Sequence, residues 1–182
     1  MSFRDRLSRL GIVPLARRYI VMNSFDGVLV VLGIIVSQIA TKNAEAVFHA
    51  GIASGMGLAI SGVTSAYMAE KAERDIEVER LERAMLSELK GRREASRVAT
   101  MFLSIINGIS PLLAVLLIIS PFAFLVFEQA LYVSIVLCSV LLFTLGAYLA
   151  RISDRNMVVY GLQMLMAGLI TALLTIGLTN AL

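Results

Sequence analysis

Residues 98–119 have the sequence VATMFLSIINGISPLLAVLLII, a stretch of 22 residues without a charged side chain. A helix needs about 20 mainly apolar residues to cross the ~30 Å hydrocarbon core of a bilayer. Further apolar stretches of similar length occupy residues 19–40, 46–68, 131–150 and 157–179. The stretch at 98–119 is the third of the five in chain order, and its helix could continue as far as Phe127. The sequence therefore predicts an all-α integral membrane protein with five transmembrane helices.

The composition supports a membrane protein over a soluble one. Of the 182 residues, 58% are hydrophobic, and the mean hydropathy is +0.85, whereas soluble domains are about 45–50% apolar. The net charge of +3 does not indicate a nucleic-acid partner, because the basic residues lie where membrane topology requires them. Cys138 is the only cysteine, so the chain has no intrachain disulfide and no paired zinc motif. We expect no tightly bound cofactor and no cleavable signal peptide.

The distribution of lysine and arginine predicts the orientation in the membrane. Fifteen of the sixteen fall on one side of the predicted spans: five before the first span, eight between spans two and three, and two between spans four and five. Only Lys42 falls on the other side. Because cytoplasmic loops are enriched in basic residues, the N-terminus is expected in the cytoplasm and the C-terminus outside. The membrane is expected to be the cell membrane.

The chain divides into four predicted parts: an amphipathic, arginine-rich segment at 1–18, spans one and two at 19–69, a charged cytoplasmic segment at 70–97, and spans three to five at 98–182. The charged segment is rich in helix formers, so we expect it to extend the second helix into the cytoplasm as far as a turn near Gly91. Glu70–Arg74 and Glu79–Arg83 are spaced for ion pairs within this helix. An apolar stripe of Val78, Leu81, Met85 and Leu89 indicates that the helix packs against a partner.

Four of the five spans carry a polar face. Asn23 and Asp26 lie on the polar face of the first span. The polar face of the third span includes Asn107, and the polar face of the fifth includes Gln163. A charge at membrane depth costs at least ~2.5–3.5 kcal/mol and commonly marks an ion pathway. Helix packing is the alternative explanation for the small and weakly polar residues, and also for Asp26, which lies only two turns into its span near the cytoplasmic interface. The Gly51–Gly55–Ala59 repeat is of the kind that permits close helix contact. The segment 107–111 is expected to be kinked or unwound.

The acidic residues after the second span have two explanations. Glu70, Glu73 and Glu77 are spaced one helical turn apart, and carboxylates in this arrangement can hold a divalent cation. The same segment also has the balanced charges of an ordinary salt-bridged helix.

Three motifs resemble the vacuolar iron transporter family. Ser24-Phe25-Asp26-Gly27-Val28 is similar to the family's Asp-Gly near the start of span one, and Glu73-Arg74-Asp75-Ile76-Glu77 to the polar run that leaves span two. Residues 108–113, GISPLL, are similar to its Gly-x-x-Pro-Leu-Leu in span three. The family also has a Met-x-x-Gly-Glu-like element in span two, where this chain has Gly62, Ser65 and Ala66 instead, with Met68 as a candidate methionine.

The resemblance implies a transporter, not an enzyme. It implies a homodimer in the lipid bilayer that exports Fe²⁺ or Mn²⁺ from the cytoplasm in exchange for protons. Asp26 would be a carboxylate of the transport site, with the other pathway candidates Asn23, Met68, Asn107 and Gln163, and Glu70, Glu73 and Glu77 as further metal-binding candidates. The alternative is a non-transporting membrane scaffold that dimerises through its cytoplasmic helix.

Overall fold

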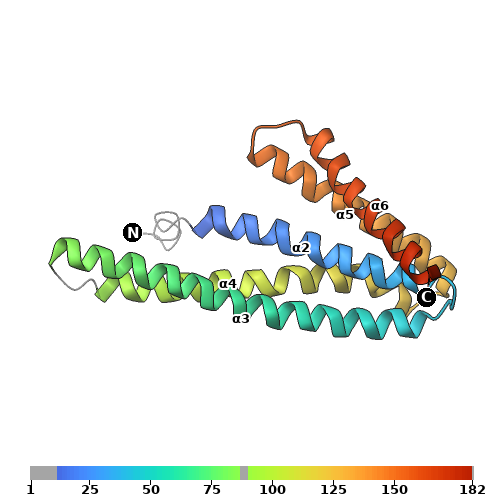
Figure 1. Cartoon of the computed structure of the whole chain (residues 1–182), viewed down its shortest axis with the longest axis horizontal. Coiled ribbons are helices and arrows are strands. Elements are labelled where there is room, and N and C mark those ends of the chain that lie inside the picture. Colours follow the sequence, from blue (N-terminus) through green and yellow to red (C-terminus); the bar gives the residue numbers. More distant parts are fainter. Residues whose placement is uncertain (1–11, 87–89, 182) are drawn as a thin grey trace. The chain divides into compact units, whose positions relative to one another are not determined.

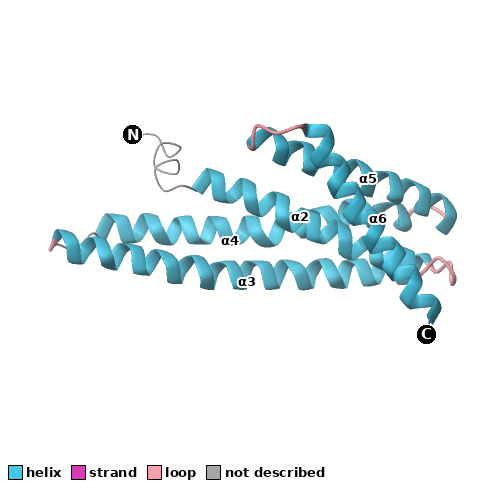
Figure 2. Ribbon diagram, turned by 45° about the horizontal axis from the view of Figure 1, so that its top comes forward, coloured by secondary structure: helices cyan, strands magenta, loops and turns pink. Residues whose placement is uncertain are grey.

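The computed structural model describes residues 12–86 and 90–181, and all regular structure in this part of the chain is helical (Figures 1 and 2). The elements in chain order are α2 (Ile12–Ser37), α3 (Ala44–Met85), α4 (Lys90–Ile119), the 3₁₀ helix η1 (Ser120–Ala123), α5 (Phe127–Ile152) and α6 (Met157–Ala181). Five helices in this part are long and apolar enough to cross a membrane. The prediction of an all-α protein with five spans is confirmed.

Helix α2 begins before the first apolar stretch. Residues 12–18, which the sequence analysis assigned to the N-terminal segment, are helical and lead directly into the first span. Pro14 lies in the first turn, where its missing N–H group leaves no helical hydrogen bond unmade. Residues 1–11, the remainder of the predicted amphipathic segment, lie outside the described residues.

Helix α3 continues past the second apolar stretch, as predicted. Its 42 residues correspond to a length of about 63 Å, roughly twice the thickness of the hydrocarbon core. The helix ends at Met85, and the next residue, Leu86, has a left-handed backbone with φ of 50°. The predicted turn at Gly91 is wrong, because Gly91 lies in the first turn of α4. Leu89 of the predicted apolar stripe falls outside the described residues.

Helix α4 corrects two further expectations. The segment 107–111 is not unwound, since the α-helix runs through Pro111. The third span also does not extend as a helix to Phe127. The α-helix ends at Ile119, and Pro121 lies in the first turn of η1, where a proline is tolerated.

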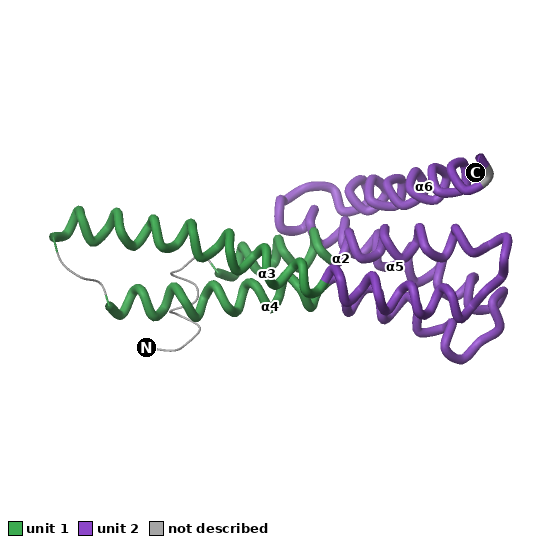
Figure 3. Tube along the Cα trace, turned by 60° about the horizontal axis from the view of Figure 1, so that its bottom comes forward, with its two compact units in different colours: residues 1–23, 59–110 green, residues 24–58, 111–182 purple. Residues whose placement is uncertain are grey.

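The chain forms two compact units, which Figure 3 shows in different colours. Unit 1 comprises residues 1–23 and 59–110, and unit 2 comprises residues 24–58 and 111–182. In unit 1, the start of α2 packs its Ile12 and Ala16 side chains against Ala99 and Leu103 of α4.

Helices α3 and α4 approach closely within unit 1. A Cβ atom on Gly108 would lie 2.4 Å from the backbone oxygen of Ala59, and one on Gly62 would lie 3.0 Å from Cα of Gly108. No side chain fits at Gly108 without moving the helices apart. The small residues therefore set the spacing of the two helices, in agreement with the packing explanation of the sequence pattern.

Unit 2 contains the larger hydrophobic core, to which α2, α3, α4 and α5 contribute buried residues. Its helices also meet at glycines. A Cβ atom on Gly27 of α2 would lie 2.8 Å from the backbone oxygen of Pro111, and one on Gly146 of α5 would lie 2.4 Å from that of Tyr160 in α6. At one end of this unit, Nζ of Lys42 donates a 2.6 Å hydrogen bond to Oε1 of Glu128. This hydrogen bond and the adjacent negative charge raise the pKa of Lys42.

Candidate functional site

A buried polar network joins α2 to α3 in unit 1. The phenol of Tyr19 donates a 2.7 Å hydrogen bond to Oε1 of Glu70, and Nε of Arg74 donates a 3.1 Å bond to Oε2 of the same carboxylate. Only 4% of Glu70 and 7% of Arg74 are exposed. Glu70 therefore has a bonding partner on each carboxylate oxygen.

This arrangement confirms the Glu70–Arg74 pair expected from the spacing of the two residues. Burial removes most of the hydration of both charges, so the pair is stable only while each charge keeps its partner. Arg74 neutralises Glu70, and Tyr19 supplies a further donor from another helix. A metal ion that reached Glu70 would have to displace or accommodate these two groups.

A second network joins three helices through asparagine side chains. Nδ2 of Asn23 in α2 donates to the backbone oxygen of Tyr19, at 2.8 Å, and to Oδ1 of Asn107 in α4, at 2.7 Å. Nδ2 of Asn107 donates in turn to the backbone oxygen of Gly62 in α3, at 2.8 Å. The structure thus brings two of the predicted pathway residues together, Asn23 and Asn107, and both are engaged in helix packing.

The other predicted pathway residues lie on the surface of their own units. Met68 in unit 1 is 67% exposed. In unit 2, Asp26 and Gln163 are both exposed. Asp26 makes no hydrogen bond or ion pair with any residue of the described chain, and it lies about 12 Å along α2 beyond Arg18, well past the last basic residue before the span.

The acidic residues of the α3 extension are mostly paired with arginine. Besides Glu70–Arg74, the predicted Glu79–Arg83 pair is present. Two further pairs link α3 to α4: Glu77 with Arg92 at 2.8 Å and Glu82 with Arg93 at 2.7 Å. Glu73 is exposed. Within residues 12–86 and 90–181, no three His, Cys, Asp or Glu side chains are grouped so that they could hold a metal ion. The salt-bridged interpretation accounts for these contacts, and metal binding by Glu70, Glu73 and Glu77 stays a prediction.

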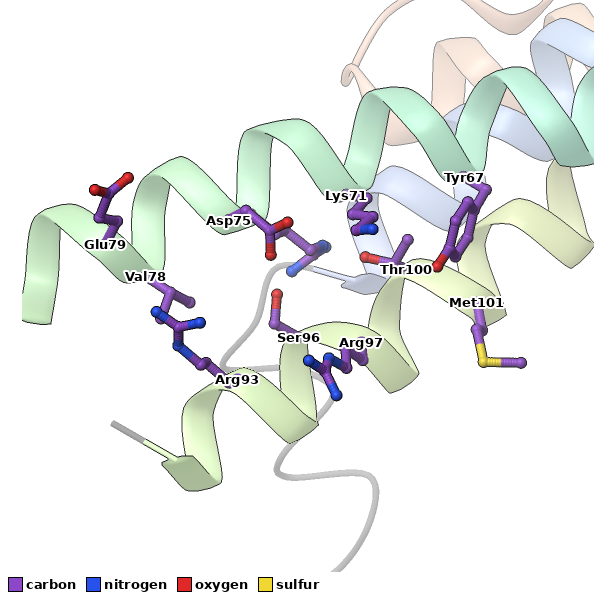
Figure 4. Close-up of a pocket in the computed structure, with 11 residues that line it drawn as sticks. Tyr67, Lys71, Asp75, Val78, Glu79, Arg93, Ser96, Arg97, Thr100 and Met101 are labelled. Carbon is purple, nitrogen blue, oxygen red and sulfur yellow. The ribbon is translucent and has the colours of Figure 1, made fainter. Parts of the chain in front are cut away.

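Unit 1 also contains a cavity of about 630 Å³ between the extended part of α3 and the start of α4 (Figure 4). Its lining combines basic, acidic and hydroxyl side chains with a few apolar ones: Tyr67, Lys71, Arg74, Asp75, Val78, Glu79, Arg93, Ser96, Arg97, Thr100 and Met101. None of the predicted pathway residues is among them. Arg74, however, connects the lining to Glu70, one of the predicted metal-binding residues.

Sequence reasoning found some of these contacts and missed others. The i,i+4 spacing identified Glu70–Arg74, but the Tyr19–Glu70 bond joins residues 51 positions apart, for which no local spacing rule exists. Ser96 lies in the charged segment before the third span, so no polar face of a span includes it. The cavity itself depends on how α3 and α4 pack, which no single-helix pattern encodes.

Comparison with known proteins adds two findings. The model of the VIT family matches residues 83–180, which is more than half of the chain. An uncharacterized protein of Methanocaldococcus jannaschii is 31% identical over 163 residues, covering 86% of this chain and 85% of the archaeal protein. The likeness therefore extends over nearly the whole length of both chains.

Proposed function

The chain belongs to the VIT family of membrane metal transporters, and we propose that it moves a divalent transition-metal ion, Fe²⁺ or Mn²⁺, across the membrane in exchange for protons. Its five membrane-spanning helices provide the multi-pass scaffold that such transport requires. Family membership favours transport over the alternative of a scaffold that only dimerises.

Asp26 is the observation that carries this proposal. Its carboxylate lies within a membrane-spanning helix, is exposed on the surface of unit 2 and has no partner among the described residues. Burial in lipid would favour the neutral, protonated form, whereas a bound divalent cation would favour the charged form. A proton and a metal ion thus compete for the same oxygen atoms, and this competition is the chemical basis of metal/proton exchange.

The exposure of Asp26 also supports a homodimer. A carboxylate that faced lipid would cost at least ~2.5–3.5 kcal/mol, so intramembrane acids almost always face protein or a water-filled cavity. Gln163, a second polar residue of unit 2, is exposed in the same way. A second copy of the chain that covers these surfaces would enclose a pathway along Asp26 and supply further ligands. Ligands from a second copy would be needed, because the described part of one chain has no group of three His, Cys, Asp or Glu side chains that could hold a metal ion.

We further propose that the N-terminus and the α3–α4 turn lie in the cytoplasm and that the metal leaves the cytoplasm as protons enter. The distribution of lysine and arginine supports the orientation. The direction of transport rests on the family resemblance.

Transport by reconstituted protein tests the proposal. The purified chain would be placed in liposomes that contain a metal-sensitive dye and a pH indicator, with Mn²⁺ or Fe²⁺ outside and a proton gradient imposed. We expect metal flux that depends on the gradient and proton movement in the opposite direction. The Asp26→Asn variant should lose most of the flux, because the amide cannot bind or release a proton.

Glu94→Gln is the matched control, since Glu94 is an exposed acid at the start of α4. It should transport as the unmodified chain does. Undiminished transport by Asp26→Asn would remove Asp26 from the mechanism, and absence of flux for every metal tested would contradict transport itself.

A further inference from the structure

We propose that the cavity between α3 and α4 in unit 1 binds a phosphate group, carried either by the headgroup of an anionic membrane lipid or by soluble phosphate. Asp26 does not line this cavity, and the proposal does not depend on the proposed transport function.

The charges that line the cavity favour an anion. Four basic side chains line it, Lys71, Arg74, Arg93 and Arg97, against two acids, Asp75 and Glu79. Arg74 and Arg93 are paired with Glu70 and Glu82, and Glu79 is paired with Arg83.

Two of the basic side chains remain available for a ligand. Lys71 and Arg97 make no ion pair with any carboxylate of the described chain, and Nζ of Lys71 lies 6.0 Å from the ring centre of Tyr67. Arginine suits a phosphate well, because its planar guanidinium can donate two parallel hydrogen bonds, and lysine adds a compact positive charge.

Two hydroxyl groups line the cavity beside the basic side chains. Ser96 and Thr100 are mostly buried as whole residues, and neither hydroxyl bonds to another residue of the described chain. Since no buried side-chain oxygen or nitrogen in the described chain lacks a partner, these two hydroxyl oxygens are open to the cavity and can donate to a phosphate oxygen there. They stand one turn apart on α4 with Arg97 between them in sequence, and Figure 4 shows both on the side of α4 that faces α3.

The position of the cavity along the helices matches the level of lipid headgroups. On α3 the lining begins at Tyr67, where the apolar stretch gives way to charged residues, and on α4 it ends at Met101, just inside the next apolar stretch. Basic pockets between helices at this level are a recognised type of site for anionic lipid headgroups. The amphipathic Tyr67 also suits this interfacial position.

The phosphate-binding proposal makes a specific prediction for Asp75. Its carboxylate lines the cavity together with the basic groups, and its negative charge opposes a bound anion. Removal of that charge by Asp75→Asn should therefore tighten binding, whereas a cavity that binds cations would respond in the opposite way.

Isothermal titration calorimetry of the full chain in a non-ionic detergent tests the proposal. The probes are dihexanoyl phosphatidylglycerol, dihexanoyl phosphatidylcholine as the zwitterionic comparison, and sodium phosphate. We expect Arg97→Gln and Lys71→Gln each to weaken binding of the anionic probe about tenfold, through the loss of a charge-assisted hydrogen bond. Thr100→Val, which leaves the charge unchanged, should weaken it about threefold.

Arg80→Gln is the matched control, because Arg80 is exposed on the same extension of α3 and does not line the cavity. Binding of phosphatidylglycerol with the expected losses identifies a lipid source, and equally sensitive binding of inorganic phosphate alone identifies a soluble source. The proposal is overturned if neither probe binds, if Arg80→Gln weakens binding as much as Arg97→Gln does, or if Asp75→Asn weakens it.

Discussion

Tyr19 donates a hydrogen bond to Glu70 across 51 positions of the chain, and this bond ties the first helix to the middle of the longest one. The Glu70 carboxylate is buried and also accepts a hydrogen bond from Arg74. Tyr19→Phe removes the hydroxyl alone and keeps the ring. Because hydrogen bonds to charged groups contribute about 1.5–3 kcal/mol, we expect a lower thermal unfolding temperature in detergent, measured by circular dichroism. Tyr148→Phe, an exposed tyrosine of α5, should leave it unchanged.

The buried Glu70–Arg74 pair should show strong coupling between its two members. Arg74→Met alone leaves an uncompensated carboxylate and should cost about 3–5 kcal/mol of stability. The double variant Glu70→Gln, Arg74→Met removes both charges and should be clearly more stable than Arg74→Met. A double-mutant cycle from denaturant unfolding measures this coupling, and additive effects of the two changes would contradict it.

The Lys42–Glu128 pair is exposed to solvent and so contrasts with the buried Glu70–Arg74 pair. Its side chains remain 62% and 66% exposed, and exposed pairs contribute about 0–1 kcal/mol. Lys42→Ala should therefore change the unfolding temperature very little. A loss as large as that of Arg74→Met would show that exposure does not govern the strength of these pairs.

A glycine at a helix contact and a glycine without one should respond to alanine in opposite ways. Gly108→Ala would place Cβ 2.4 Å from the backbone oxygen of Ala59, so we expect a marked loss of stability. Gly57→Ala meets nothing within 4 Å. It should be neutral or stabilise by up to about 1 kcal/mol, because alanine is the better helix former. Thermal unfolding of the two variants side by side measures the difference.

The orientation of the chain can be tested by cysteine labelling in intact cells. Cys138 is buried, so its reaction with a maleimide should be slow, and its replacement by alanine gives a clean background. In that background, Lys42→Cys should react with a membrane-impermeant maleimide added outside. Arg83→Cys should react only after the membrane is permeabilised. The reverse pattern would invert the proposed topology.

The sequence predicted the number and order of the membrane helices because hydropathy marks the segments that lipid surrounds. It was less accurate about where the helices begin and end. Helix α2 starts seven residues before the predicted span, since hydrogen bonding of a helix continues into polar sequence. Helix α3 ends at Met85 and Gly91 already belongs to α4, which shows that a glycine near a helix end need not be the residue that terminates it.

Contacts within one helix were predictable, whereas contacts between helices were not. The Glu79–Arg83 pair follows from its spacing, as in any isolated helix. The pairs of Glu77 with Arg92 and of Glu82 with Arg93 depend on the position of the turn, which the sequence analysis misplaced. The hydroxyls of Ser96 and Thr100 likewise gain their significance only from the packing of α3 on α4.

The length of the α3 extension makes its tip a sensitive place for a probe. From Glu70 to Met85 it measures about 22 Å along the helix axis, so a tilt of about 10° at Glu70 would carry Met85 through about 4 Å. The bond from Tyr19 of α2 holds Glu70 at the start of this extension. A fluorophore or spin label at Met85, which is exposed, would amplify sub-ångström rearrangements among the membrane helices into distance changes large enough to record.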